Sequence, residues 1–190
     1  MSEPVLVTER LELWRPQASD RAGLLALIAP EAVREFLGPA EASETDVFAR
    51  LLRNAGSWAL YGYGVFQVRE RGGDGTIIST AGVFRSFRGF GQGMDDVPEA
   101  GWIVAQAHWG KGYALEAMRA ALAWFNREHG PQRIACMIEE GHEASAAIAA
   151  KLGFIEYARH QSEGERALVL YERLSGRCRL KASPSAPAPR

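Results

Sequence analysis

The sequence of 190 residues contains only two cysteines, Cys136 and Cys178, which lie far apart and form no Cys-x-x-Cys pair. This disfavours a disulfide framework, and we expect two reduced thiols in a cytoplasmic protein. The start of the sequence has neither a basic region nor an apolar run, so we expect no secretory signal. No stretch approaches the roughly 18 apolar residues that a membrane span needs, so we expect no membrane partner.

An excess of charge of either sign is also lacking, because the formal net charge is -1. Nucleic-acid binding depends on dense positive charge, so we expect no nucleic-acid partner. The apolar share of 47% is ordinary for a globular chain, and this length buries a core without disulfides or metals. We expect one domain over residues 5–174. The Pro-, Ala- and Ser-rich end cannot pack a core and predicts a flexible tail over residues 175–190.

Strand and helix patterns alternate between these limits. Alternation of apolar and polar residues, turn signals and helical spacing predict strands over residues 11–14, 65–70, 76–84, 99–105, 133–138, 155–159 and 167–174. Long helices are predicted over residues 114–128 and 144–152. Before the hairpin at 65–84, a helix capped by Ser43 is expected to turn Phe48, Leu51, Leu52 and Ala55 inward. This order predicts a mixed α/β sheet with helices on both faces.

The segment His108-Trp109-Gly110-Lys111-Gly112-Tyr113-Ala114 joins a predicted strand to a helix. A helix start has unpaired N–H groups and the positive end of the helix dipole, and glycines let a ligand approach the backbone. These properties indicate a cradle for phosphate oxygens. The third glycine of the dinucleotide fingerprint and the Gly-Lys-Ser/Thr of a P-loop are missing, so a tight turn without a ligand is the alternative.

The same segment resembles the acetyl-CoA-binding motif of the GNAT acetyltransferases, Arg/Gln-x-x-Gly-x-Gly/Ala. Gly112 and Ala114 occupy its last two positions. Trp109 stands at the Arg/Gln position, as in the branch of ribosomal-protein N-terminal (RimJ/RimL-type) acetyltransferases. Three further stretches resemble that branch: Thr8-Glu9-Arg10-Leu11, Glu99-Ala100-Gly101-Trp102-Ile103 and Lys151-Leu152-Gly153-Phe154.

The resemblance covers residues 5–174 and implies the GNAT fold. That fold has a mixed, mostly antiparallel central sheet, helices on both faces, and a splayed pair formed by the fourth and fifth strands. It implies acetyl-CoA as the acyl donor, lying in the opening between these strands, and no metal. Homodimers are common for this fold, so the resemblance also allows a homodimer.

In this family the fourth strand is bulged and its backbone pairs with the pantetheine arm, which places Ile103, Val104 and Ala105 along the arm. One N–H of that strand would polarise the thioester carbonyl, as an oxyanion hole does. The pyrophosphate would lie on the N–H groups of the turn. The turn residues predicted to bind the donor are Trp109, Gly110, Lys111, Gly112, Tyr113, Ala114 and Leu115.

Catalysis needs a group that takes the proton of the attacking amine. Glu99 matches a glutamate that some family members use as this base, and alternation places Glu99, Gly101 and Ile103 on one face of the strand. An exposed carboxylate without a role is the alternative. Many members protonate the leaving thiolate with a tyrosine on the last helix, but no tyrosine occurs between Glu139 and Leu152.

The family's Asn-x-x-Ser motif places two more residues beside the donor. Ser145 matches the serine, and we predict that it donates a hydrogen bond during catalysis and contacts the donor. His142 replaces the asparagine and is predicted to contact the pantetheine arm, with a solvent-facing histidine as the alternative.

The sequence leaves the acceptor open. The branch implies a protein N-terminal α-amine, and a small-molecule amine is the alternative. Arg85 and Arg88, among aromatic residues, suggest a grip for a carboxylate or an acidic peptide, against a solvated loop. The missing tyrosine and the His142 substitution also leave room for a non-catalytic acyl-CoA-binding module.

Overall fold

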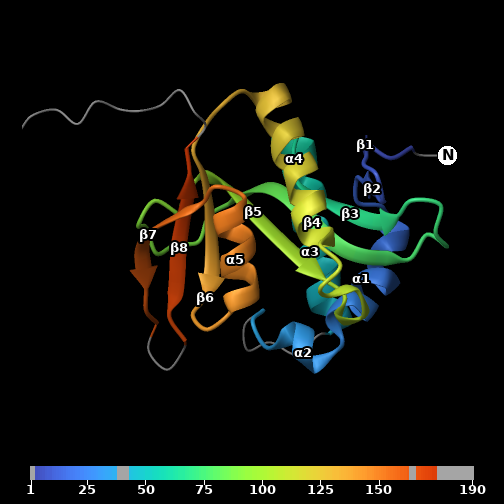
Figure 1. Ribbon diagram of the computed structural model, residues 1–190, viewed down its shortest axis with the longest axis horizontal. Coiled ribbons are helices and arrows are strands. Elements are labelled where there is room, and N and C mark those ends of the chain that lie inside the picture. Colours follow the sequence, from blue (N-terminus) through green and yellow to red (C-terminus); the bar gives the residue numbers. More distant parts are fainter. Residues whose placement is uncertain (1–2, 38–42, 163–165, 175–190) are drawn as a thin grey trace, which may run out of the picture.

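A computed structural model describes residues 3–37, 43–162 and 166–174. The tail predicted over residues 175–190 lies outside these ranges. The described chain forms one sheet of eight strands in the order β1-β2-β3-β4-β5-β6-β8-β7 (Figure 1). The strands are β1 (Leu6–Val7), β2 (Leu11–Trp14), β3 (Val65–Glu70), β4 (Ile77–Ser86), β5 (Val97–Val104), β6 (Ile134–Glu139), β7 (Ile155–His160) and β8 (Leu168–Arg173).

Helices connect the strands at three places. The helical elements are η1 (Ala18–Asp20), α1 (Arg21–Ile28), α2 (Glu31–Arg34), α3 (Glu44–Tyr61), η2 (Gln106–His108), α4 (Tyr113–His129) and α5 (Glu143–Lys151). Ser43 caps α3 as predicted, because its side chain accepts the Asp46 N–H. Figure 1 shows α4 and α5 in front of the sheet.

Both faces of the sheet are covered, as the sequence predicted. All residues of β4 from Ile77 to Val83 are buried, so neither face of this central strand meets solvent. On one face Phe66 packs with Met118 and Phe125 of α4. On the other face Ile77 packs with apolar residues of α1 and with Val47 of α3.

The inward face predicted for α3 is wrong in three of four positions. Leu51 is buried, but Phe48 is 49% exposed, Leu52 is 55% exposed, and Ala55 is also exposed. The helix instead buries Val47, Leu51, Ser57 and Trp58. Two apolar stripes lie side by side on α3, and only the stripe that faces the sheet is covered.

Strands β5 and β6 separate soon after they meet. They are parallel, and their pairing is recorded at one position, Glu99 opposite Ala135. By contrast, β4 and β5 pair antiparallel over eight positions without a register shift. The fourth and fifth strands of the family correspond to β5 and β6 here. The splayed strand pair is therefore present, but the bulge expected in β5 is not. The opening forms because β6 diverges from a regularly paired β5.

Candidate active site

The gap between β5 and β6 exposes one edge of β5. The Ala105 N–H donates to the Ile78 carbonyl at 2.9 Å, so this amide belongs to the pairing with β4. In a regular antiparallel pair, successive residues direct their backbone groups to opposite sides. The amides of Ile103 and Gly101 therefore also face β4, whereas those of Trp102 and Val104 face the gap.

This alternation divides the three residues predicted along the pantetheine arm. Only Val104 directs its N–H into the gap. The Ile103 side chain packs with the α1 and α3 cluster, and its carbonyl accepts the Ser79 hydroxyl at 2.7 Å. The sequence analysis did not predict that the Trp102 N–H faces the gap. The same alternation that groups Glu99 with Gly101 and Ile103 places Trp102 with Val104 and could have indicated it.

The turn between β5 and α4 has the backbone that its glycines predicted. Gly110 and Gly112 have φ angles of 74° and 79°, in the left-handed region that favours glycine. The Glu116 N–H bonds the Gly112 carbonyl at 3.1 Å, which closes the first turn of α4. The N–H groups of residues 113–115 precede that bond and have no partner within the helix.

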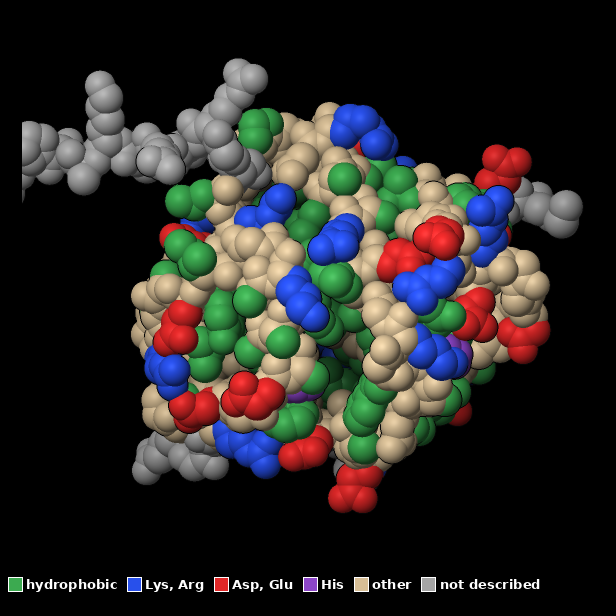
Figure 2. All heavy atoms as spheres, viewed as in Figure 1, with side chains coloured by type: hydrophobic (Ala, Val, Ile, Leu, Met, Phe, Trp, Pro, Cys, Tyr) green, Lys and Arg blue, Asp and Glu red, His purple; other side chains and the backbone are tan. Residues whose placement is uncertain are grey.

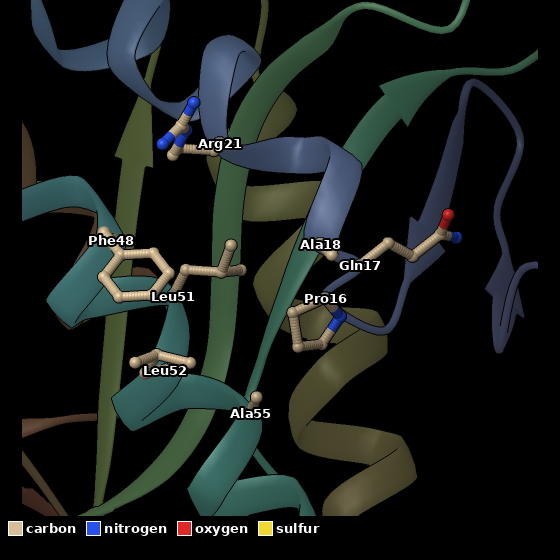
Figure 3. A pocket seen from close by; sticks show the side chains of 8 residues that line it. All are labelled: Pro16, Gln17, Ala18, Arg21, Phe48, Leu51, Leu52 and Ala55. Atoms are coloured by element: carbon tan, nitrogen blue, oxygen red, sulfur yellow. The ribbon is translucent and has the colours of Figure 1, made fainter. Parts of the chain in front are cut away.

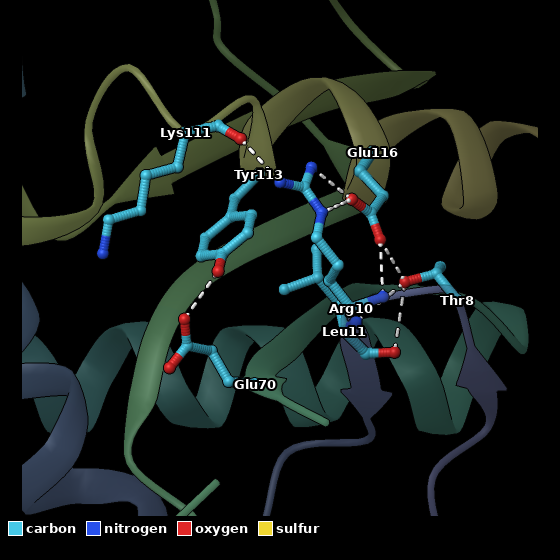
Figure 4. Close-up of polar contacts among 7 residues, drawn as sticks. All are labelled: Thr8, Arg10, Leu11, Glu70, Lys111, Tyr113 and Glu116. Carbon is cyan, nitrogen blue, oxygen red and sulfur yellow. Dashed lines mark hydrogen bonds and ion pairs between the residues drawn. The ribbon is translucent and has the colours of Figure 1, made fainter. Parts of the chain in front are cut away.

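Side chains of the turn brace it. The Trp109 indole N–H donates to the Val104 carbonyl at 2.8 Å, which ties the turn to the end of β5. The Tyr113 hydroxyl donates to Glu70 Oε1 at 2.6 Å (Figure 4). Ala114 is buried, and Leu115 is half-buried in the core, so these two residues offer a ligand their backbone rather than their side chains.

The start of α5 brings His142 and Ser145 together. The Ser145 hydroxyl and His142 Nε2 are 3.0 Å apart. Burial lowers the pKa of His142, with Glu35 acting in the opposite direction, so the imidazole is neutral at neutral pH. Its ring stacks on Phe36 with the centroids 4.2 Å apart, which joins the segment after α2 to the start of α5. His142 is therefore half-buried in an aromatic contact rather than free in solvent.

A hollow marks the gap on the molecular surface. Figure 2 shows it near the middle of the face, between α5 and the end of β5 as drawn in Figure 1, with hydrophobic side chains along the opening. A different hollow, of about 320 Å³, lies between η1 and α3 (Figure 3). Its lining is Pro16, Gln17, Ala18, Arg21, Phe48, Leu51, Leu52 and Ala55. The second hollow contains none of the predicted site residues.

Glu99 lies where β5 and β6 still pair, three residues and about 10 Å before Trp102. Its side chain is only 3% exposed, so the alternative of an exposed strand carboxylate is wrong. The Arg88 guanidinium bonds both carboxylate oxygens, and the Ser86 hydroxyl donates to Oε2 at 2.5 Å. A base at this position must therefore work within a formed hydrogen-bond network.

The two arginines suggested as a grip for acidic acceptors both have partners within the chain. Arg88 pairs with Glu99, and Arg85 donates to Asp96 from Nε at 2.9 Å and from Nη2 at 2.7 Å. The loop that carries Arg88 is held by Asp95, which accepts the N–H groups of Arg88, Gly89 and Gly91. Both arginines therefore already pair with acidic residues of this chain, Arg85 from β4 and Arg88 from the loop after it.

Cys136, next to Ala135 on β6, is a buried free thiol. Burial raises the pKa of this thiol, and the charge of Glu99 acts in the same direction. Iodoacetamide at pH 8 is therefore expected to leave Cys136 unmodified in the folded protein and to modify it in denaturant. Mass spectrometry of the Cys136 peptide, quantified apart from that of Cys178, measures this. Modification of Cys136 at equal rates in both conditions would contradict the burial.

Two further properties bear on the kind of site. Within residues 3–37, 43–162 and 166–174, no cluster of His, Cys, Asp or Glu side chains has an arrangement that holds a metal ion. Among the helices of these ranges, none combines the length and apolar character needed to cross a bilayer.

The sequence pattern of the acetyltransferase (GNAT) domain matches residues 10–155. The chain belongs to the GNAT acetyltransferase family. A GNAT-family acetyltransferase from Bordetella pertussis of known structure is 34% identical, with a TM-score of 0.78 over 88% of this chain and 98% of that one. The Bacillus subtilis (strain 168) protein YkkB is 29% identical over 175 residues, which are 90% of this chain and 95% of YkkB.

A further similar structure is that of RimL, a ribosomal L7/L12 α-N-protein acetyltransferase, in complex with coenzyme A. It has a TM-score of 0.70 at 15% identity, over 91% of this chain and 98% of RimL. These findings confirm the predicted GNAT fold and the predicted membership of the GNAT family, and RimL shares this fold. Family membership makes the chain an acetyl-CoA-dependent acyltransferase, and it favours an enzyme over a module that only binds acyl-CoA.

Proposed function

We propose that this enzyme acetylates the α-amine at the N-terminus of a protein, with acetyl-CoA bound in the β5–β6 gap. The placement of the donor in this gap is supported by the order of three elements along the chain. Beyond Glu99 the edge of β5 is free of β6, and the chain then passes through η2 and the glycine turn into the open N-terminus of α4. An amide-bearing pantetheine arm fits the strand edge, and a pyrophosphate fits the helix start.

The donor would be held mainly by backbone groups. The N–H groups of residues 110–115 take the pyrophosphate, and the gap-facing N–H groups of Trp102 and Val104 take the pantetheine arm and the thioester. Lys111 is exposed at the rim and adds positive charge. His142 and Ser145 contact the arm from the start of α5, where the neutral imidazole remains able to accept or donate a hydrogen bond.

Acetyl transfer then follows from direct attack. The neutral amine attacks the thioester carbonyl, and the carbon–oxygen double bond becomes an oxyanion that accepts the Trp102 N–H. The tetrahedral adduct expels the CoA thiolate as the amide forms. The amine's surplus proton passes to Glu99, directly or through water. The thiolate accepts a hydrogen bond from the Ser145 hydroxyl and takes its proton from solvent.

The surroundings of Glu99 favour an α-amine over a lysine side chain. The pKa of a lysine amine is about 10.4 and that of an α-amine about 7.8, a gap of roughly 2.6 units or ~3.5 kcal/mol of proton removal. Both oxygens of Glu99 already accept hydrogen bonds from Arg88 and Ser86. Hydrogen bonds to both oxygens make the carboxylate less able to take up a proton. Such a base suits the α-amine, because its proton is easier to remove than that of a lysine amine. The acceptor named for RimL, a ribosomal protein α-amine, agrees with this choice.

Acetyl-CoA at 100 times its Kd is expected to stabilise the fold by about 2.7 kcal/mol, which raises Tm by about 5–10 °C for a chain of this size. A thermal-shift titration with acetyl-CoA and CoA measures this. Turnover is then compared between peptides with a free N-terminus, the same peptides with a blocked N-terminus and a free lysine, and small amines such as polyamines. The absence of any shift would overturn the donor site. Turnover of small amines alone would overturn the acceptor and leave the donor site standing.

A further inference from the structure

The start of the chain contacts the first turn of α4, more than 100 residues away (Figure 4). The Thr8 hydroxyl and the Arg10 N–H donate to Glu116 Oε1 at 2.6 and 3.0 Å. Arg10 Nε donates to Glu116 Oε2 at 2.7 Å, and Nη1 donates to the Lys111 carbonyl at 2.9 Å. One arginine therefore bonds both the first turn of α4 and the glycine turn before it.

The carboxylate of Glu116 presents an electrostatic conflict. An acidic side chain in the first turn stabilises a helix through its dipole. The same helix end is the proposed pyrophosphate site, where an uncompensated negative charge repels the ligand. Burial alone would raise the pKa of Glu116, but the hydrogen bonds from Thr8 and Arg10 outweigh it and lower the pKa. Glu116 is therefore charged at neutral pH, and the Arg10 guanidinium compensates it.

The bond to Lys111 sets the direction of a proposed ligand donor. In a planar trans peptide, the N–H points opposite to the carbonyl of the preceding residue. Because Arg10 holds the Lys111 carbonyl on its own side, the Gly112 N–H points away from Arg10. In Figure 1, β1 and β2 lie on one side of α4, whereas α5 and β6 lie on the other. Arg10 thus approaches the turn from the side opposite to the gap.

We propose that Arg10 is a positioning residue for the phosphate cradle, which compensates the charge of Glu116 and fixes the peptide that presents the Gly112 N–H. Arg10 acts from behind the turn and is not itself a phosphate ligand. Thr8 supports it by holding the second oxygen of Glu116. This inference rests on the proposed acetyl-CoA site and adds the residue that makes an acidic helix start compatible with an anionic donor.

The test compares Arg10→Ala, Glu116→Gln and the double variant with the unmodified enzyme. Isothermal titration with CoA and steady-state kinetics with acetyl-CoA give Kd, KM and kcat. Arg10→Ala is expected to raise Kd and KM about tenfold, with kcat changed less than about twofold. The double variant is expected to recover a part of that loss, because the uncompensated charge is gone. Arg127→Ala, which removes an exposed arginine at the other end of α4, is the matched control.

A donor without phosphates separates positioning from general stability. S-acetylpantetheine has the thioester and the arm but no pyrophosphate, so Arg10→Ala is expected to leave its KM unchanged. Equal losses with acetyl-CoA and S-acetylpantetheine would overturn the proposal, because they indicate a general brace. No recovery in the double variant would overturn the compensation of Glu116. If the unmodified enzyme bound neither CoA nor acetyl-CoA, the donor site itself would be wrong, which is a separate outcome.

Discussion

Replacement of Glu99 by glutamine is expected to lower kcat for amine acetylation by about two to four orders of magnitude, the usual contribution of a general base. Glutamine keeps the shape of the side chain and one oxygen for Arg88, but it cannot take up a proton at neutral pH. Steady-state kinetics with an α-amine peptide and saturating acetyl-CoA measure the loss. The KM for acetyl-CoA is expected to stay within about threefold, because Glu99 lies at the closed end of the gap.

A pH profile distinguishes a base from an anchor for Arg88. The residual activity of Glu99→Gln is expected to rise with pH in step with the free-amine fraction of the peptide. Arg88→Ala breaks the same ion pair but keeps the carboxylate, so its kcat is expected to fall far less. Glu140→Gln, which alters an exposed ion pair with Arg159, is the matched control. If Glu99→Gln and Arg88→Ala lost activity equally and kept the same profile, Glu99 would serve only to hold Arg88.

The elements that build the proposed donor site are the ones that local sequence rules describe well. A strand that runs into glycines with positive φ and then into a helix follows from backbone geometry, and so does the serine cap of α3. The strand and helix patterns therefore predicted the backbone of the proposed cradle at Trp109 to Ala114. Alternation along β5 also correctly placed Glu99 with Gly101 and Ile103, because side-chain direction along a regularly paired strand is a local property.

The parts that the sequence could not predict depend on partners far along the chain. The gap exists because β6 leaves β5 after one recorded pair, and no pattern within β5 encodes where β6 goes. The partners of Glu99 are Arg88 and Ser86, which only the β4–β5 register brings to it. The contact between Arg10 and Glu116 spans 106 positions and was predicted at neither end.

The prediction of the buried face of α3 was wrong for a physical reason that stability measurements can test. Phe48 and Leu52 lie one residue beyond Val47 and Leu51, so both pairs have helical spacing and hydropathy alone cannot choose between them. Coverage by the sheet and α1 decides, and it buries Val47 and Leu51. Phenylalanine at a covered position and at an uncovered one should then contribute very differently to stability.

Replacement of Phe125 by alanine is expected to lower the free energy of unfolding by about 3–5 kcal/mol, the usual cost of removing a buried phenylalanine. Phe125 is fully buried in the cluster beneath α4 and meets the ring of Tyr63 edge-on at 4.9 Å. Phe48→Ala, at a position 49% exposed, is expected to cost about 1 kcal/mol or less. Chemical denaturation of both variants measures the difference.

Phe125 lies near the end of α4, whereas the proposed cradle lies at its first turn. Its replacement is therefore expected to affect the proposed donor site only by lowering the stability of the fold. For a chain of this size, the expected change lowers Tm by about 6–20 °C. Phe125→Leu, which keeps most of the apolar volume, is expected to recover more than half of the lost free energy. Equal destabilisation by Phe48→Ala and Phe125→Ala would contradict the packing described for α3 and α4. Saturating acetyl-CoA should raise the Tm of Phe125→Ala as it does that of the unmodified protein, because the cradle lies at the other end of the helix.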